Sequence, residues 1–523
     1  MQPVWADADP LSGMTLEQRI GQMFVVNLYG PQLTEAGRDF LTRVQPGGVV
    51  LIGDNIGTPE ALTALINSYQ QTITKAGGVP LFVAVDQEGG PISHLRDGFT
   101  LFPTPTLLTA SGQTALARQV GAAMAAELRA VGVNMNLAPV ADLETNPDNP
   151  IITRRSFGSD PTLVSPIIAA YIEGLQSAGV LATAKHFPGH GETDSDSHTT
   201  LPILDLARER LDAVELAPFR AAIGAGVEVM MAAHIWYPAL EPQENLPASL
   251  SPNVITGLLR GELGYDGLVM TDALDMDAID TSYAYPDAAL NAVQAGVDLV
   301  IAAHIGLDSQ EAAVQAIADA VRDGRISEAR VDESVRRILD AKARYNLLEW
   351  TPLNPATVTE RLPLDANAAL VEEQFRAGVT RVFDHAGLLP LTEASNALII
   401  YPATRPTIVQ ECGGYNIELD WLGVSESPTD EEIAWAADAA TRAGTVVTFT
   451  QNADRQQQAL VQSLPAERTV VVALWSPYDV LLFPQIAAYV VTYSPLRPAV
   501  PAACALLFGA VEGGTMAVTL PGM

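Results

Sequence analysis

Eight short runs rich in Val, Leu, Ile and Met recur through the first 305 of 523 residues, and a longer stretch with helical spacing of apolar residues follows each run. The runs show no strict alternation of apolar and polar residues, which is typical of strands buried on both faces of a parallel sheet. Eight such strand–helix units in about 300 residues predict an α/β fold with a (β/α)8 barrel. We expect the barrel strands at residues 24–28, 48–52, 81–86, 133–137, 181–186, 227–234, 267–272 and 297–303.

Helices and a linker complete the predicted barrel. Three segments between the strands carry Ala, Leu, Glu and Arg at helical spacing, namely 116–130, 206–223 and 312–321. A last amphipathic stretch covers 327–348. The segment TPLNPATVTERLPL follows it, and its prolines and lack of periodicity indicate a linker.

A second, smaller α/β domain is predicted beyond this linker. Strand-like runs that alternate with helical segments lie at 397–401, 445–450, 469–474 and 488–493. This alternation favours an αβα sandwich. The chain is therefore expected to consist of a barrel at 1–349, a linker at 350–366 and the sandwich at 367–523.

The composition is that of a globular protein with a large core, because 48% of the residues are hydrophobic and 17% are charged. The net charge of −32 would repel nucleic acid and anionic membrane surfaces, since binding to either depends largely on Lys and Arg. No apolar run reaches the roughly 18–20 residues that span a bilayer, and MQPVWADADPLSG lacks the basic and apolar regions of a secretion signal. We therefore expect a cytoplasmic protein with no nucleic-acid or membrane partner. The two cysteines, Cys412 and Cys504, allow a single disulfide.

Polar side chains end several of the apolar strands, where the active sites of such barrels lie. Asp86 follows the third strand in DQEGG, Lys185 and His186 end the fifth in KHFPGHGETDSDSH, and Asp272 ends the seventh in GLVMTDALDM; Arg155 lies between the fourth and fifth strands in RRSFGSDP. A carboxylate at Asp272 is suited to attack an anomeric carbon, and Lys185 and Arg155 would favour its ionised form. The alternative, an Asp that caps the next helix, is weaker because these polar groups recur together.

The segment 189–198 is rich in Gly, Asp, Ser and Thr, which is typical of a functional loop on a rigid barrel. Asp196 precedes His198 by two residues. An Asp beside an imidazole orients the ring and stabilises its protonated form, and a His can donate or accept a proton near neutral pH. The pair is suited to protonate a leaving oxygen and then to activate water. The alternative is an exposed loop with an incidental His.

A zinc site is a further interpretation of the same loop. His186, His190, Asp194 and His198 have the residue types and the short spacing that zinc ligands show. Pro188 and two glycines disfavour the helical face that a zinc motif of this spacing needs. We therefore predict no metal and no organic cofactor.

These motifs resemble those of a known family. KHFPGHGETDSDSHTTLP is similar to the signature of glycoside hydrolase family 3 β-N-acetylglucosaminidases, in which a loop holds an Asp-x-His acid/base pair. DQEGG, APVAD, RSFGSDP, MAAHI and GLVMTDALDM occur in the order and at the approximate spacing of that family, so the resemblance covers residues 16–348. HAGLLPL and AVTLPG also resemble parts of the family's αβα C-terminal domain.

The resemblance implies a retaining enzyme that removes terminal β-linked N-acetylglucosamine from a carbohydrate. It implies Asp272 as nucleophile and His198, tuned by Asp196, as acid/base. The implied sugar contacts are Asp86, Arg155, Lys185 and His186. The second domain would then have a structural or oligomer-forming role, since the chemistry is complete within the barrel.

One motif departs from the family pattern. Relatives usually continue EGG with R-V-x-R, whereas this chain reads EGGPISHLR and places Pro91 and His94 where arginines are expected. Either a substrate contact is lost or Arg96 takes its place.

Three other functions stay open at this point. Phosphate in place of water would make the enzyme a phosphorylase, and a sugar 1-phosphate product would reveal it. A family 3 β-glucosidase is a second alternative, and comparing an aryl β-glucoside with its 2-acetamido analogue tests it. A non-catalytic glycan-binding barrel is a third alternative, and a turnover assay distinguishes it from the enzymes. The natural leaving group is also open, although a chain of charge −32 gains no long-range attraction for anionic cell-wall fragments.

Overall fold

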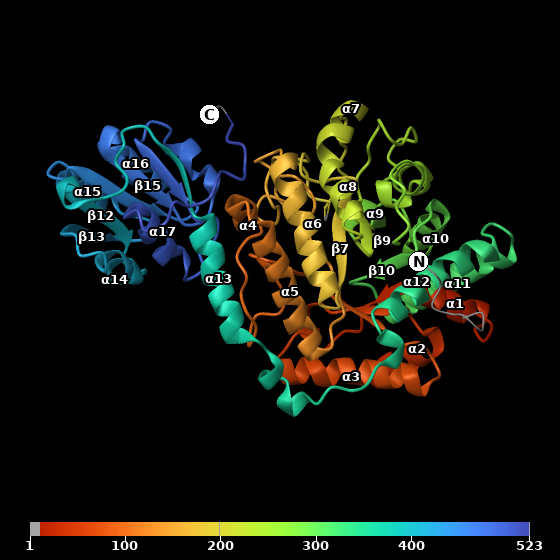
Figure 1. The fold of residues 1–523 in the computed structure, drawn as a ribbon. Coiled ribbons are helices and arrows are strands. Elements are labelled where there is room, and N and C mark those ends of the chain that lie inside the picture. Colours follow the sequence, from red (N-terminus) through yellow and green to blue (C-terminus); the bar gives the residue numbers. More distant parts are fainter. Residues whose placement is uncertain (1–10, 198, 522–523) are drawn as a thin grey trace. The chain divides into compact units, whose positions relative to one another are not determined.

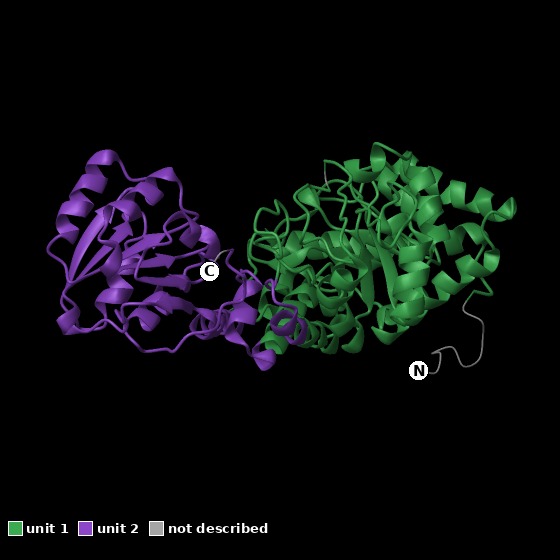
Figure 2. Ribbon diagram, turned by 90° about the horizontal axis from the view of Figure 1, so that it is seen from above, with its two compact units in different colours: residues 1–100, 117–156, 168–364 green, residues 101–116, 157–167, 365–523 purple. Residues whose placement is uncertain are grey.

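A computed structural model describes residues 11–197 and 199–521 of the chain. The chain folds into two compact units, which Figure 2 shows in different colours. Unit 1 consists of residues 1–100, 117–156 and 168–364, and unit 2 consists of 101–116, 157–167 and 365–523. Unit 2 thus includes two short segments from the first part of the chain, which the sequence did not indicate.

The two short segments bond to the C-terminal part of unit 2. Thr104 donates a hydrogen bond to the Tyr493 carbonyl over 2.9 Å. Ser159 and Thr519 join their hydroxyl groups over 3.0 Å. These contacts explain why the two segments belong to unit 2. The sequence did not indicate them, because the patterns that predict strands and helices carry no information about contacts between distant residues.

Unit 1 is a closed barrel of eight parallel strands in the order β1-β10-β9-β8-β7-β6-β3-β2, with helices on its outside (Figure 1). The eight predicted strands and the barrel fold are confirmed. The strands are β1 Phe24–Val26, β2 Gly48–Val50, β3 Phe82–Val85, β6 Met135–Asn136, β7 Leu181–Phe187, β8 Val229–Ala232, β9 Leu268–Ala273 and β10 Leu299–Ala302. A short antiparallel hairpin of β4 Gln87–Gly89 and β5 Ile92–Ser93, which was not predicted, follows β3.

Local signals in the sequence set the helix ends. Helix α3 Pro59–Lys75 begins after Thr58, whose side chain accepts a hydrogen bond from the Ala61 N–H, and Pro59 occupies its first turn. Helix α10 Tyr285–Ala295 ends at Gly296, whose positive φ of 115° suits glycine.

The four helical stretches predicted for the barrel are present. Three of them are α5 Thr114–Val131, α11 Leu307–Arg322 and α12 Glu328–Arg344. The fourth, predicted at 206–223, is divided into α7 Arg208–Arg210, a π-helical turn Leu211–Glu215 and α8 Ala217–Gly224. Pro218 lies in the first turn of α8, where its missing N–H breaks no helical hydrogen bond.

Unit 2 contains a six-stranded sheet in the order β11-β16-β15-β14-β12-β13. Its strands are β11 Thr380–Asp384, β12 Ala397–Pro402, β13 Leu419–Val424, β14 Thr445–Thr450, β15 Thr469–Ala473 and β16 Ala488–Val491. All neighbours are parallel except β11 and β16. The predicted αβα sandwich is confirmed; the two edge strands, β11 and β13, were not predicted.

Helices cover both faces of this sheet. Figure 1 shows α15 Asp430–Ala440 and α16 Arg455–Ser463 on one face, and α14 Thr407–Gly413 and α17 Ala499–Leu507 on the other. A disulfide between Cys412 and Cys504 joins α14 to α17. In the described parts of both units, no helix has the length and apolar character that crossing a membrane requires.

Candidate active site

A cavity of about 550 Å³ lies in unit 1 at the carboxyl ends of the barrel strands, within the range of about 300–1,000 Å³ that small-molecule sites occupy. Six of the seven residues predicted for the site line it, namely Asp86, Arg155, Lys185, His186, Asp196 and Asp272. The seventh, His198, lies outside the described residues. The barrel thus brings residues from four separate motifs to one place.

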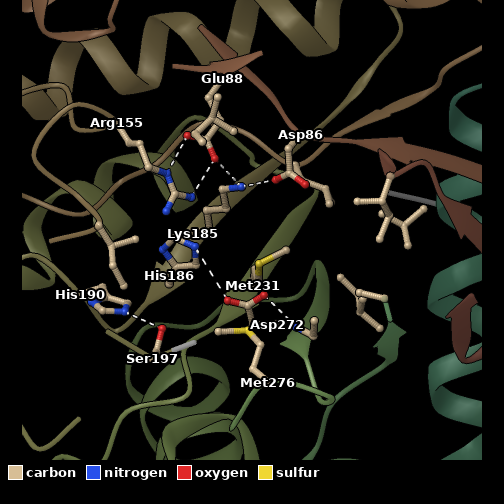
Figure 3. A pocket seen from close by; sticks show the side chains of 18 of the residues that line it. Asp86, Glu88, Arg155, Lys185, His186, His190, Ser197, Met231, Asp272 and Met276 are labelled. Atoms are coloured by element: carbon tan, nitrogen blue, oxygen red, sulfur yellow. Dashed lines mark hydrogen bonds and ion pairs between the residues drawn. The ribbon is translucent and has the colours of Figure 1, made fainter. Parts of the chain in front are cut away.

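Glu88 connects the polar side chains at the closed end of the cavity (Figure 3). Its carboxylate accepts two hydrogen bonds from Arg155, over 2.9 Å from Nε and 2.8 Å from Nη2. Lys185 Nζ lies 2.7 Å from the same Glu88 carboxylate and 2.5 Å from Asp86 Oδ1. The lysine is therefore held between two carboxylates that lie two residues apart in the chain after β3.

Opposite charges fix the ionisation of this network. Burial raises the pKa of Glu88, but Arg155 and Lys185 lower it by more, to about 2. Burial lowers the pKa of Lys185, but Asp86 and Glu88 raise it above its ordinary value. Glu88, Lys185 and Arg155 are therefore charged at neutral pH. The network presents donors and acceptors suited to the hydroxyl groups of a sugar.

Asp142, which follows β6, holds the end of β7 in place. Its Oδ1 accepts hydrogen bonds from the backbone N–H groups of His186 and His190, over 3.0 and 2.8 Å. Its Oδ2 lies 2.7 Å from His186 Nδ1. Burial raises the pKa of Asp142 to about 6, so the carboxylate is still ionised at neutral pH. Burial and then Arg155 lower the pKa of His186 well below its ordinary value, so the neutral ring donates Nδ1–H to Asp142.

Asp272 lies near the end of β9, with its carboxylate facing the cavity between His186 and Met276 (Figure 3). Its Oδ2 is 3.9 Å from His186 Nε2, and its Oδ1 accepts a hydrogen bond from the Ala273 N–H over 2.7 Å. The Ala273 carbonyl in turn accepts from His234 Nε2 over 3.0 Å, which ties β9 to the end of β8.

The Asp272 carboxyl is kept ionised. Burial raises its pKa, but His186, His234, the Ala273 N–H and Lys185 together lower it by more. Of these groups, the Ala273 N–H and Lys185 lower the pKa without any charge on the imidazoles. An ionised carboxylate in a largely enclosed cavity is a competent nucleophile.

The loop after β7 is tied down at its start by two glycines and an asparagine. Gly189 has a φ of +133°, and a Cβ at Gly191 would lie only 1.5 Å from the Leu143 carbonyl oxygen. Asn149 donates hydrogen bonds to the carbonyls of His190 and Gly191, over 2.9 and 3.1 Å. The first residues of the loop therefore follow one path across the cavity wall.

His190 holds the part of the loop that contains Asp196. Its Nε2 and the Ser197 hydroxyl are 3.0 Å apart, and its Nδ1 is 3.0 Å from the Thr193 hydroxyl (Figure 3 shows His190 and Ser197). Asp196 precedes Ser197, is half-buried and lines the cavity. These hydrogen bonds bring a carboxylate of the loop to the same cavity as Asp272.

The structure places the two residues of the divergent EGGPISHLR motif differently from one another. His94 lines the cavity, and Pro91 is exposed at the turn of the hairpin. Arg96 is exposed and is not among the lining residues. Of the two alternatives, Arg96 in place of a lost contact is not supported, and His94 brings an imidazole to the cavity.

Two histidines of the zinc interpretation, His186 and His190, make other contacts. His186 bonds to Asp142, and His190 bonds to Ser197 and Thr193. Asp194 is exposed and accepts a hydrogen bond from the Ser195 hydroxyl. Among the described residues, no group of three or more His, Cys, Asp or Glu side chains is arranged around a possible metal position.

Two residues of the site were missed by sequence reasoning. Glu88 lies in DQEGG, from which only Asp86 was chosen, and Asp142 lies in APVAD, to which no role was given. A signal for both was present, because each follows a predicted barrel strand by a few residues. Neither residue directly ends a strand, because Glu88 lies two residues and Asp142 five residues beyond the predicted strand ends.

Comparisons with known proteins agree with this architecture. The model of the glycosyl hydrolase family 3 N-terminal domain matches residues 15–341. β-Hexosaminidase A of Pseudoalteromonas piscicida is 33% identical over 391 residues, which cover 71% of this chain and 64% of that protein. A Cellulomonas fimi protein named β-N-acetylglucosaminidase/β-glucosidase is 28% identical over 522 residues, covering 92% of this chain and 90% of that protein.

A solved structure extends the similarity to both units. The family 3 β-N-acetylglucosaminidase from Paenibacillus sp. str. FPU-7 has a TM-score of 0.81 and 34% sequence identity, over 97% of this chain and 99% of that one. The match to the Pseudoalteromonas protein spans less than two thirds of that protein's length. The family match covers the barrel and every described residue of the cavity, and this chain belongs to glycosyl hydrolase family 3.

Proposed function

We propose that the protein is a retaining β-N-acetylhexosaminidase that removes terminal β-linked N-acetylglucosamine from a carbohydrate. The observation that carries the proposal is Asp272, an ionised carboxylate at the end of a barrel strand, facing a cavity whose other wall is a fixed network of sugar-binding groups. The names of the Pseudoalteromonas and Paenibacillus relatives support the 2-acetamido sugar.

In the proposed first step, Asp272 attacks the anomeric carbon and forms a covalent glycosyl-enzyme. The bond to the leaving oxygen breaks while His198, assisted by Asp196, donates a proton to that oxygen. In the second step, the same pair accepts a proton from water, and the water attacks the anomeric carbon and releases Asp272. Two inversions give net retention.

The charged network holds the sugar for this chemistry. Asp86, Lys185 and Arg155 offer fixed donors and acceptors to ring hydroxyl groups, and Glu88 keeps the two cations in position. His186 lies between this network and Asp272, with Nε2 free of the Asp142 contact and turned toward the nucleophile. Its neutral Nε2 is suited to accept a hydrogen bond from a sugar hydroxyl.

The test is an Asp272→Ala variant assayed on an aryl β-N-acetylglucosaminide. We expect turnover to be nearly abolished, because no other carboxylate of the described cavity lies on β9. Added azide should restore part of the rate and give an α-glycosyl azide, since the small anion enters where the carboxylate was. The control is Asp280→Ala, an exposed residue on the same βα connection. Wild-type turnover by Asp272→Ala would refute the nucleophile assignment.

A second candidate, β-glucosidase activity, is favoured by one observation. The Cellulomonas relative, which matches along almost the whole chain, carries both activities in its name. An aryl β-glucoside assayed beside its 2-acetamido analogue separates the two. Running both in phosphate buffer and searching for a sugar 1-phosphate also tests whether phosphate replaces water in the second step.

A further inference from the structure

Tyr29 is an aromatic side chain that the structure leaves in contact with solvent. It follows β1 by three residues, at the carboxyl end of the barrel, and is 53% exposed. Among the described residues of unit 1, no other Phe, Tyr or Trp side chain is exposed. Single exposed apolar side chains are common on proteins, but the carboxyl end of a barrel is where its active site is built. An exposed ring at this end is therefore suited to contact a substrate.

The backbone on both sides of Tyr29 is held in place. The Asn55 side-chain amide donates hydrogen bonds to the carbonyls of Leu28 and Gly30, over 2.7 and 2.8 Å. The Tyr69 hydroxyl also donates to the Leu28 carbonyl, over 3.3 Å. A ring on a fixed backbone loses less conformational freedom when a ligand binds, so binding costs less entropy.

The chain after β1 is joined to both neighbouring segments of the cavity wall. Strand β1 lies between β2 and β10 in the barrel. After β2, Asn55 Oδ1 accepts a hydrogen bond from the backbone N–H of Ile52, a lining residue, over 3.1 Å. After β10, Gln310 of α11 donates to the carbonyls of Asn27 and Ile305, over 3.3 and 2.8 Å. The chain after β1 thus lies between two segments that contribute lining residues.

Asp275 interacts with both Tyr29 and the exposed edge of the cavity. Its carboxylate accepts hydrogen bonds from the backbone N–H groups of the lining residues Ala303 and His304, over 3.0 and 2.6 Å. The His304 side chain, whose Nδ1 lies 3.4 Å from Asp275, is 69% exposed. Burial and then the Asp275 carboxylate raise the pKa of the Tyr29 hydroxyl. Tyr29 and His304 are therefore two exposed rings near one carboxylate at the edge of the cavity.

The edge of the cavity is exposed on two sides of the barrel. Of the described lining residues, only Pro150, after β6, and His304, after β10, are exposed, and every charged one is half-buried or buried. Strands β6 and β10 lie on opposite sides of the closed barrel. Among the described residues of unit 1, only the His304 edge has an exposed Phe, Tyr or Trp near it. A substrate that extends out of the cavity over this edge meets Tyr29.

We propose that Tyr29 is the platform on which the leaving sugar of a disaccharide or longer substrate stacks. The inference rests on the proposed function, which places the terminal sugar in the charged network and its anomeric carbon at Asp272. An aromatic ring offers a large apolar face, and the C–H groups on one face of a pyranose pack against it. The contact forms in the bound substrate and persists in the transition state, so it lowers KM without raising kcat.

The test compares two substrates that differ by the second sugar. N,N′-diacetylchitobiose has one, and methyl β-N-acetylglucosaminide has only a methyl group in its place. Both leaving groups are alkyl alcohols, which need general acid help alike. We expect Tyr29→Ala to raise KM for the disaccharide about 3- to 10-fold without a change in kcat, and to leave the kinetics on the methyl glycoside unchanged.

Tyr29→Phe keeps the ring and should keep the wild-type KM for the disaccharide. Trp435→Ala is the matched control, because it removes an exposed aromatic side chain from unit 2, and it should alter the kinetics on neither substrate. Wild-type kinetics of Tyr29→Ala on the disaccharide would overturn the inference, as would an equal loss on both substrates or an equal loss in Tyr29→Phe. In each of these cases, turnover of an aryl β-N-acetylglucosaminide by the wild type would leave the proposed function intact. No turnover of any of the three substrates would overturn the proposed function and this inference with it.

Discussion

At the scale of single residues, Glu88 shows how a side chain that is not expected to react still determines the site. Replacing it with Gln keeps its shape but removes the carboxylate that pairs with both Arg155 and Lys185. We expect Glu88→Gln to lower kcat/KM on an aryl β-N-acetylglucosaminide by about 10- to 100-fold, because a hydrogen bond to a charged group contributes about 1.5–3 kcal/mol. The melting temperature should fall as well. Steady-state kinetics and thermal unfolding measure both effects.

The matched control is Glu173→Gln, which also removes a carboxylate from an ion pair with an arginine. Glu173 and Arg118 are 44% and 50% exposed, and such surface pairs contribute about 0–1 kcal/mol. Neither kinetics nor stability should change measurably in the control. Equal effects in the two variants would show that the Glu88 network has no special role.

Lys342 is a second buried cation, but none of the described residues forms an ion pair with it. Its Nζ donates to Gln22 Oε1 over 2.8 Å and lies 5.1 Å from the centre of the Phe82 ring. Burial lowers its pKa from 10.5 to about 7. Between pH 7 and 10.5 the unfolded chain therefore keeps a proton that the folded chain has released, and the stability of the fold rises with pH across this window.

A Lys342→Met variant should remove this pH dependence. We expect its melting temperature to exceed that of the wild type by a few degrees at pH 6, where the buried charge destabilises the fold most, and the gain should shrink toward pH 9. Thermal unfolding at both pH values measures it. Lys75→Met is the control, since Lys75 is exposed on α3, and it should not alter the pH dependence. A constant difference between wild type and Lys342→Met at the two pH values would contradict the buried-charge explanation.

At the scale of elements, Gly191 tests how closely the loop after β7 must pass the barrel. A Cβ at this position would lie 1.5 Å from the Leu143 carbonyl oxygen, so Gly191→Ala must displace the backbone that leads to Asp196. General acid help is worth about 10²- to 10⁴-fold on poor leaving groups and much less on good ones. We expect the variant to lose far more kcat on a disaccharide than on a nitrophenyl glycoside.

Gly224→Ala is the control for the loop prediction. Gly224 lies at the end of α8, and a Cβ there would meet no atom within 4 Å. Its kinetics should match the wild type on both substrates. A loss in Gly191→Ala that is equal for good and poor leaving groups would show that the loop path does not act through the acid/base pair.

The same scale shows what the sequence can predict. All eight barrel strands were predictable because buried parallel strands are continuous apolar runs, as in Leu268–Ala273. The edge strand Leu419–Val424 was missed because its solvent-facing residues, such as Asp420, interrupt the pattern. The strand Thr380–Asp384 was missed for the same reason, since Arg381 is exposed.

The candidate site was predictable where a polar residue directly ends an apolar strand. This rule located Asp86, Lys185 and Asp272. It did not locate Glu88 or Asp142, which lie two to five residues further along and join the site only through the way the chain turns after β3 and β6. Pairings of that kind depend on distances between strands, which spacing along the chain does not specify.

At the scale of the whole molecule, the described residues of the cavity all belong to unit 1, while the disulfide belongs to unit 2. Cys412 and Cys504 are 92 residues apart in the chain and are both fully buried. Disulfides form in oxidising compartments and are rare in the cytosol. The expected cytoplasmic location stays a prediction, and the bridge weighs against it.

We expect protein isolated from its native source to carry this bridge, because its two sulfur atoms are buried together between α14 and α17. Unfolding in an alkylating reagent should label neither cysteine unless a reductant is added first, which mass spectrometry measures.

A bridge that closes a loop of this length contributes about 4–5 kcal/mol in the chain-entropy account. Reduction should therefore lower the unfolding transition of unit 2 in calorimetry. Turnover of an aryl β-N-acetylglucosaminide below that transition should not change, since the chemistry is assigned to unit 1. Two alkylated cysteines without reductant would instead support the cytoplasmic location, and a loss of turnover on reduction would show that unit 2 contributes to the reaction.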